Sequence, residues 1–212
     1  MFRRVAVLAV LAVLTLTATV GCADTATPVS PSPLPSASLT ASPVAAGAPW
    51  YDEVTPATAG TTVGPEGTAC PLSMTFSVPP KWKVKAVKAG TDYRAGPALL
   101  LCEIDAKPAG NIGFLRIWQI EGARPLNPQV TVDKFLAEYG SKAEDQQYRR
   151  TKAGSLDSFE AAWTEDGTRK RAIMVSTLYG QLMLTLGGLD NEEFEEMFPA
   201  YQLAKSSVSL PK

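Results

Sequence analysis

Two carboxylates of the sequence, Glu103 and Asp105, have a spacing that suits acid–base chemistry. They lie two residues apart in a segment expected to be extended, where alternate side chains point to the same face. Paired carboxylates of this kind act as general acid and base in hydrolases, or bind Ca²⁺. No second set of ligands is visible, so a structural role is favoured: Asp105 begins a turn, and Glu103 meets a lysine or a backbone donor.

The chain contains no histidine, which excludes several kinds of active site. Ser-His-Asp and Cys-His catalysis and His-ligated zinc sites all need an imidazole. A Ser-Lys dyad would need a Ser-x-x-Lys helix start, which the sequence does not offer. We therefore predict a protein that is not an enzyme and holds no cofactor or metal; a carboxylate-dependent hydrolase using Glu103 is an alternative.

A candidate binding face comes from Arg116 and Trp118, which share one face of an expected strand, with Trp163 as a third member. An arginine beside a tryptophan can bind a sugar or phosphate through stacking and charge. The alternative is a core tryptophan with an arginine at the sheet edge. Two basic runs, 149–152 and 169–171, are interpreted as solvated strand faces. With 20 basic and 21 acidic residues, the chain lacks the basic excess of a nucleic-acid-binding protein, so no such partner is expected.

Cys22 follows a segment typical of a secretion signal, in which two arginines precede an apolar run at 5–16. This run is too short to cross a bilayer, which takes about 20 helical residues. The Thr-Val-Gly-Cys sequence at 19–22 resembles the lipobox of bacterial lipoproteins, where the cysteine receives a diacylglyceryl group and cleavage precedes it. We predict removal of 1–21 and a lipid anchor on Cys22. The alternative is an ordinary signal peptide that leaves this cysteine as a stray thiol.

Cys70 and Cys102 would then lie in an oxidising compartment, where paired thiols persist as disulfides. A redox-active pair would favour a Cys-x-x-Cys arrangement, which is absent. We predict a structural disulfide, which by closing a loop of about 33 residues would stabilise the fold by about 3–4 kcal/mol.

The composition divides the chain into a stem and a domain. Residues 22–68 are rich in Ala, Pro, Thr and Ser, with few large aliphatic side chains, so we expect a disordered stem. Trp50 and Tyr51 interrupt it, and either pin it to the domain or form a short sticky site. Residues 69–212 are expected to form one globular domain.

Alternating and apolar runs predict strands at 72–78, 82–87, 98–104, 112–120, 147–152, 159–165, 169–178 and 181–186. The apolar stripe at 132–139 predicts an amphipathic helix with Thr131 as its N-cap. Asp190 and Glu193 predict a capping box for a second helix, which Pro199 kinks or restarts. The strands are joined by short turns such as Asp166-Gly167, typical of antiparallel pairs. The predicted class is therefore α+β: a mostly antiparallel sheet with helices on each face.

This pattern resembles the actinobacterial lipoproteins of the LpqN/LpqT type, whose fold is similar to that of the photosystem protein PsbP. The resemblance rests on the segment 75–82, the helix at 132–139, the hairpin around Tyr179-Gly180 and the closing segment 204–208. The family pattern has glycine before the tryptophan, where this chain has Lys81. The resemblance implies an α/β/α sandwich and a noncatalytic envelope or accessory protein, and it assigns no functional residues.

The sequence thus favours a lipoprotein held on the outer face of the cytoplasmic membrane, whose domain binds an envelope partner without catalysis. The membrane, through the lipid anchor, is one expected partner, and an envelope protein, lipid or glycan is the other. A carrier that holds a lipid or glycolipid in an apolar pocket between helix and sheet is the alternative.

Overall fold

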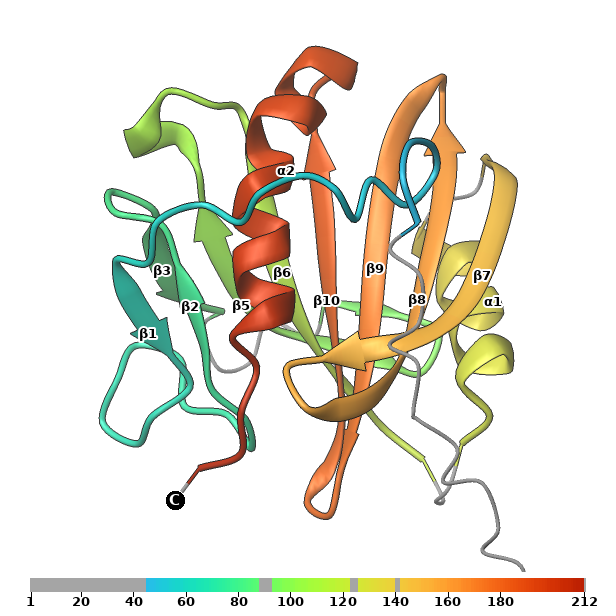
Figure 1. Ribbon diagram of the computed structural model, residues 1–212. Coiled ribbons are helices and arrows are strands. Elements are labelled where there is room, and N and C mark those ends of the chain that lie inside the picture. Colours follow the sequence, from blue (N-terminus) through green and yellow to red (C-terminus); the bar gives the residue numbers. More distant parts are fainter. Residues whose placement is uncertain (1–44, 88–92, 123–125, 140–141, 212) are drawn as a thin grey trace, which may run out of the picture. The chain divides into compact units, whose positions relative to one another are not determined.

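The computed structural model describes residues 45–87, 93–122, 126–139 and 142–211 (Figure 1). Within these ranges, an eight-stranded antiparallel sheet follows the order β3-β5-β6-β10-β9-β8-β7, and β4 pairs with β5. Its strands are β3 (Lys83–Ala86), β4 (Arg94–Ala95), β5 (Ala98–Asp105), β6 (Gly113–Ile120), β7 (Ala143–Ala153), β8 (Leu156–Glu165), β9 (Thr168–Thr177) and β10 (Gly180–Gly188). A separate pair joins β1 (Thr61–Val63) to β2 (Phe76–Val78), and a 3₁₀ turn, η1, spans Lys107–Ala109.

One helix covers each face of the sheet, as Figure 1 shows. Helix α1 (Pro128–Tyr139) packs on β4, β7 and β8, whereas α2 (Asn191–Ser206) packs on β2, β6, β7, β9 and β10. Successive side chains of a strand point to opposite faces, so alternate residues are buried in two separate hydrophobic cores. The larger core lies under α2 and the smaller under α1. The predicted α+β class, with a mostly antiparallel sheet between helices, is confirmed.

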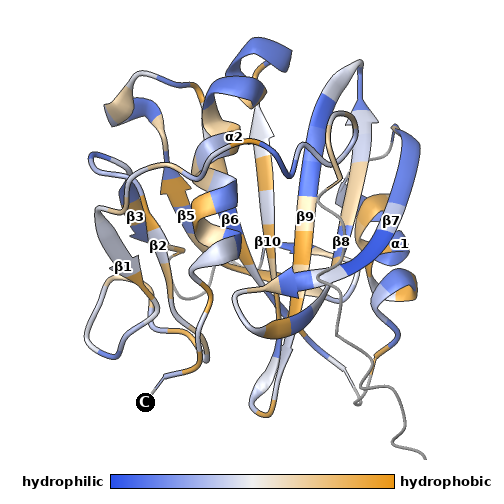
Figure 2. Ribbon diagram, in the orientation of Figure 1, coloured by the Kyte–Doolittle hydropathy of each residue, from blue (hydrophilic) through white to orange (hydrophobic). Residues whose placement is uncertain are grey.

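The central strands of the sheet are more hydrophobic than the edge strand β7. Figure 2 shows hydrophobic residues on the central strands, whereas β7 is hydrophilic over most of its length. Strand β10 has seven consecutive buried residues, from Gly180 to Leu186, because it is covered on both faces. The edge strand β7 carries mainly polar and charged side chains, which discourage pairing with another sheet edge.

The turn between β8 and β9 is formed as the sequence predicts. Asp166 and Gly167 have φ values of 48° and 78°, so both adopt the left-handed conformation that a two-residue hairpin turn needs. Lys81, before Trp82, also has a positive φ, of 70°. This conformation favours glycine, because a side chain with a Cβ atom is sterically disfavoured there.

The helix starts differ in part from the prediction. Asn127, not Thr131, caps α1: its side chain accepts from the Val130 amide at 3.3 Å, and the helix begins at Pro128. Proline suits this first helical turn, where its missing N–H has no intrahelical partner. Asp190 caps α2 as predicted, accepting from the Glu193 amide at 2.9 Å.

The second hydrogen bond of a capping box, from the N-cap amide to the Glu193 side chain, is replaced by a different one. The Glu193 carboxylate accepts from the Ile112 amide at 2.7 Å, and so ties α2 to the start of β6. Pro199 lies inside α2 without ending it.

The predicted boundary of the domain at residue 69 is wrong, because the described fold begins near residue 45. Residues 45–57, which we call the strap, cross the α2 face of the sheet (Figure 1). The strap is fixed at its end by a hydrogen bond from the Ala57 amide to the Pro199 carbonyl, 2.9 Å, after which the chain enters β1. Trp50 and Tyr51 pin the strap to the domain. Residues 1–44, with the signal segment and Cys22, lie outside the described residues.

The predicted disulfide joins Cys70 to Cys102, with their Cα atoms 6.2 Å apart. Both cysteines are buried in the core under α2. The bond links the loop before β2 to β5, and so attaches the small β1–β2 pair to the main sheet. In the described part of the chain, no helix has the length and hydrophobicity to cross a bilayer.

Candidate functional site

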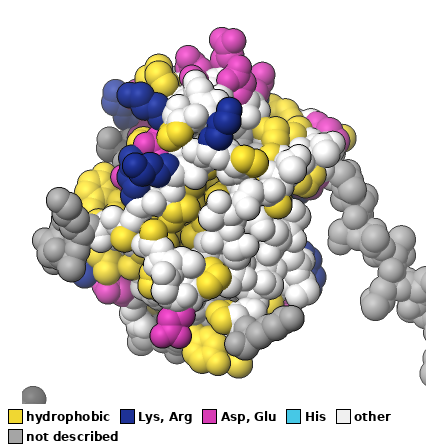
Figure 3. Space-filling model, turned by 90° about the vertical axis from the view of Figure 1, so that its left-hand side faces the viewer, with side chains coloured by type: hydrophobic (Ala, Val, Ile, Leu, Met, Phe, Trp, Pro, Cys, Tyr) yellow, Lys and Arg dark blue, Asp and Glu magenta, His cyan; other side chains and the backbone are white. Residues whose placement is uncertain are grey.

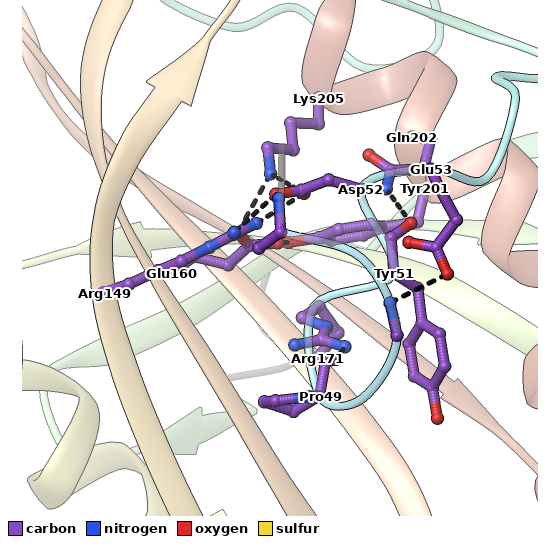
Figure 4. Close-up of polar contacts among 12 residues, drawn as sticks. Pro49, Tyr51, Asp52, Glu53, Arg149, Glu160, Arg171, Tyr201, Gln202 and Lys205 are labelled. Atoms are coloured by element: carbon purple, nitrogen blue, oxygen red, sulfur yellow. Dashed lines mark hydrogen bonds and ion pairs between the residues drawn. The ribbon is translucent and has the colours of Figure 1, made fainter. Parts of the chain in front are cut away.

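A buried ionic network lies where the strap, the β7–β8 edge and α2 meet (Figure 4). At its centre is Glu160 of β8, whose side chain is fully buried. Its carboxylate accepts hydrogen bonds from Lys205 Nζ at 2.9 Å and from the Tyr201 hydroxyl at 2.8 Å, both on α2. It also accepts from Arg149 Nη2 at 2.5 Å, because Arg149 lies directly opposite on β7.

Asp52 of the strap completes the network by a two-pronged pair with Arg149. The Oδ2 and Oδ1 atoms lie 2.5 and 2.6 Å from Nη1 and Nη2, and Lys205 Nζ is 3.4 Å from Oδ1. Burial works to raise the pKa of Asp52, but the Arg149 hydrogen bond and the nearby Lys205 charge outweigh it and hold the pKa below 3.8. A lowered carboxyl pKa stabilises the fold above that ordinary value, and this contribution is lost as the pH falls through the lowered pKa.

Aromatic contacts reinforce the hold of the strap on the sheet. The Arg149 guanidinium lies 4.3 Å from the centre of the Trp50 ring, and Tyr51 packs edge-on against Phe198 of α2. Gln202 of α2 also donates to the Tyr51 carbonyl at 3.0 Å. The strap is therefore held by charge, stacking and hydrogen bonding together.

Beside the network is a groove of about 890 Å³, walled by the strap, β7 and the C-terminal half of α2. Its lining residues are Asp52, Val54, Pro56, Arg149, Arg150, Thr151, Lys152, Gly154, Asp157, Gln202, Lys205 and Ser206. Four of these side chains are cationic and two are anionic. Arg150 is exposed, whereas Lys152 forms a surface pair with Asp157 at 2.5 Å. The arrangement suits anionic or hydrogen-bonding groups rather than apolar ones.

The opposite end of the molecule has a different surface. Figure 3 shows mainly hydrophobic and uncharged side chains across its centre, with charged groups towards the top of the view.

Asp105 precedes a turn, as the sequence favours, whereas Glu103 meets an arginine instead of the expected lysine or backbone donor. Glu103 accepts from Arg116 Nε at 2.7 Å, and Asp105 accepts from Lys85 Nζ at 2.6 Å and from the Lys107 amide at 3.0 Å. The hydrogen bond from Lys85 and that from the Lys107 amide lower the pKa of Asp105. Each carboxylate thus has its own cationic partner.

The predicted binding face of Arg116, Trp118 and Trp163 is not formed. Trp118 is fully buried under α1 and donates to the Thr185 hydroxyl at 3.0 Å, and Trp163 is only 3% exposed. Neither ring is available for stacking on a ligand, because both fill the smaller core. Arg116 instead pairs with Glu103 and donates to the Tyr139 hydroxyl at 2.9 Å.

Sequence reasoning missed the network because its members are far apart along the chain. Asp52 and Arg149 are 97 residues apart, and Lys205 is 153 residues from Asp52. The basic run at 149–152 was the available signal, but it is only partly a solvated face: Arg150 is exposed, whereas Arg149 points into the network. Among the described residues, no group of acidic and cysteine side chains is arranged to hold a metal ion.

Comparison with known proteins gives a family and a distant structural likeness. The model of a family described as "Uncharacterised lipoprotein" matches residues 40–208. No curated protein matches the chain. The chain is similar to the solution structure of cyanobacterial PsbP from Synechocystis, with a TM-score of 0.48, 10% sequence identity, and coverage of 72% of this chain and 98% of that one.

Proposed function

Because the chain belongs to this lipoprotein family, we propose that it is an envelope protein anchored through lipid on Cys22 and displayed on the outer face of the cytoplasmic membrane. Its domain binds an anionic envelope component without catalysing a reaction. The signal segment and the cysteine after it support the anchor. The basic groove supports the binding role.

The groove carries this proposal through its charge and its place in the fold. Arg149 and Lys205 are bound to Asp52 and Glu160, and Lys152 is bound to Asp157. Arg150 is therefore the exposed cation that the groove offers to a ligand, and the groove runs along β7, the last strand of the sheet. Arg150 and Thr151 lie on this strand, where an extended acidic segment or an anionic glycan would reach both side chains and backbone. Charge-assisted hydrogen bonds from arginine and lysine would give such a contact its strength.

The two alternatives have less support. A lipid carrier would need an apolar space between a helix and the sheet. The space beside Tyr139 of α1, about 340 Å³, is lined in part by the ion pair of Glu103 and Arg116. The rest of the α1 face is filled, since Trp118 packs at 5.1 Å from Phe135 and 5.2 Å from Tyr139, measured between ring centres. Under α2, Phe194, Met197 and Tyr201 are likewise buried in the core. A hydrolase using Glu103 would have to release that carboxylate from Arg116 first.

Photo-crosslinking in cells tests the groove directly. A photoreactive residue at Thr151 should capture an envelope component, whereas the same residue at the exposed Lys134 of α1 should not. The double variant Arg150→Glu, Lys152→Glu should abolish capture at Thr151 by reversing the charge of the groove. Lys142→Glu changes a charge that lies outside the groove lining, and capture should persist.

Protease and glycosidase treatment of the captured material would distinguish a polypeptide from a glycan. Equal capture from Thr151 and Lys134, or capture that survives the double charge reversal, would contradict the groove as the binding site.

A further inference from the structure

A second pocket, of about 340 Å³, lies on the α1 face of the sheet, apart from the basic groove. Helix α1 packs on β4, β7 and β8, so part of β5 and β6 stays uncovered beside its last residue. The pocket combines aromatic, aliphatic and charged side chains; its lining residues are Val87, Tyr93, Leu100, Glu103, Arg116 and Tyr139.

The ion pair that lines this pocket has two polar atoms to spare. Glu103 and Arg116 stand opposite each other on β5 and β6, joined from Nε to Oε1 at 2.7 Å, and their side chains are 31% and 25% exposed. Arg116 Nη1 donates to the Tyr139 hydroxyl at 2.9 Å. In the described part of the chain, Arg116 Nη2 and Glu103 Oε2 have no hydrogen-bond partner, and neither atom is buried.

Access distinguishes this pair from Arg171 of β9. Arg171 donates to the Pro49 carbonyl of the strap through Nη2, and its Nε and Nη1 atoms have no partner among the described residues. Those two atoms are buried, so no ligand can reach them. At the Glu103–Arg116 pair, by contrast, one donor and one acceptor are open to a ligand side by side.

Two tyrosine rings supply the apolar surface of the pocket. Tyr93, which precedes β4, is 50% exposed, and Tyr139 at the end of α1 is half-buried. Both rings pack on the buried Trp118, at 5.9 and 5.2 Å between ring centres, and Trp118 therefore holds them in place. Arg116 of the predicted binding face thus lines a pocket after all, but with tyrosines in place of the two tryptophans.

The balance of charge indicates what kind of ligand this pocket suits. One carboxylate and one guanidinium cancel, so the lining favours neither an anion nor a cation, and the ion pair disfavours a lipid chain. A sugar has hydroxyl groups that both donate and accept, and it has a face of C–H groups that can pack on an aromatic ring. The volume is at the small end of the range of about 300–1,000 Å³ for ligand pockets, which suits a single ring.

We propose that this pocket binds one neutral sugar ring. Neighbouring hydroxyls accept from Arg116 Nη2 and donate to Glu103 Oε2, and the C–H face packs on the ring of Tyr93. The site is separate from the basic groove, so it stands or falls independently of the proposed partner binding. A free sugar and the end unit of an envelope glycan share this chemistry, and the test distinguishes them.

Carbon-13 NMR of the tyrosine rings tests the site in the full-length protein, purified in a detergent whose headgroup is not a sugar. Tyr93→Phe and Tyr139→Phe assign the two signals. The probes are glucose, galactose, mannose, arabinose and N-acetylglucosamine. At least one should shift both signals in a saturable manner, with a Kd on the order of 1 mM. If its methyl glycoside binds equally well, the source is a glycan end; if methylation abolishes binding, the source is a free sugar.

Matched variants follow from the roles of the ring and of the charges. Tyr93→Ala should weaken binding about tenfold, whereas Tyr179→Ala, which removes an exposed tyrosine of the β9–β10 turn, should leave it unchanged. Glucuronate and galacturonate should bind more weakly than glucose and galactose. Glu103→Gln should reverse this preference, because it leaves Arg116 as the one charge of the lining.

Three results would overturn the proposal. They are tyrosine signals that no neutral sugar moves, equal binding by the unmodified protein and Tyr93→Ala, and tighter binding of the uronates by the unmodified protein. If a variant does not fold, the titrations of the unmodified protein with neutral sugars and uronates decide.

Discussion

Glu160 shows how one side chain can join elements that the sequence keeps far apart. It is fully buried, and its partners are Arg149 on β7 and Lys205 and Tyr201 on α2. Burial penalises every charge in this cluster, so the pairs are stable only together. The cluster therefore acts as a single unit that fixes the β7–β8 edge, α2 and the strap.

Replacing Glu160 by glutamine should destabilise the protein by about 3–5 kcal/mol. The neutral side chain would leave two buried cations, Arg149 and Lys205, with only the Asp52 carboxylate to balance them. Denaturant unfolding would measure the change. The matched control is Asp157→Asn, which breaks an exposed pair with Lys152 and should give no measurable change. Equal changes in the free energy of unfolding would show that the buried network contributes no more stability than an exposed ion pair.

At the level of elements, the strap is the ordered segment that its amino-acid composition did not predict. Apart from Trp50, Tyr51 and Val54 its residues are small, polar or proline, and nothing in their pattern resembles a helix or strand. Its order comes from Trp50, Tyr51 and Asp52 meeting partners on β7, β9 and α2. Such contacts depend on the finished sheet, so they could not be derived from the strap alone.

The hairpins, by contrast, could be predicted because their signals are local. Asp166-Gly167 specifies its own turn, and Asp190 caps α2 with an amide three residues away. The start of α1 was placed too late because Asn127 and Thr131 are both good caps, and only the first precedes a proline. Trp118 and Trp163 were assigned to a binding face because alternation reveals which residues share a face, but not which face is covered by a helix.

Two shortened chains would separate the strap from the residues before it. A chain of residues 45–212 should keep the stability of the longer protein. A chain of 58–212 loses Asp52 and both strap aromatics, so its free energy of unfolding should fall by at least about 3 kcal/mol. Denaturant unfolding of both, followed by tryptophan fluorescence, makes the comparison. Identical midpoints would mean that the strap rests on the domain without supporting it.

At the scale of the whole molecule, the proposed lipid anchor on Cys22 would decide where the domain resides. Replacing Cys22 by alanine should move the protein from the membrane fraction into the medium, because no acyl chain would then hold it. Fractionation and immunoblotting would measure the shift. Ser206→Ala, a change near the other end of the sequence, is the control, and this variant should remain with membranes. Retention of the alanine variant at position 22 would refute the anchor.

The strap lies between the residues that include Cys22 and the rest of the fold, and this has a mechanical consequence. Tension applied through residues 1–44 enters the described structure at Ala45 and reaches the Pro49–Arg171 and Asp52–Arg149 contacts before any strand of the main sheet. Those contacts are strained first. With the proposed anchor at Cys22, a pull through the chain would therefore disturb the contacts of Arg171 and Arg149 before it disturbed the sheet.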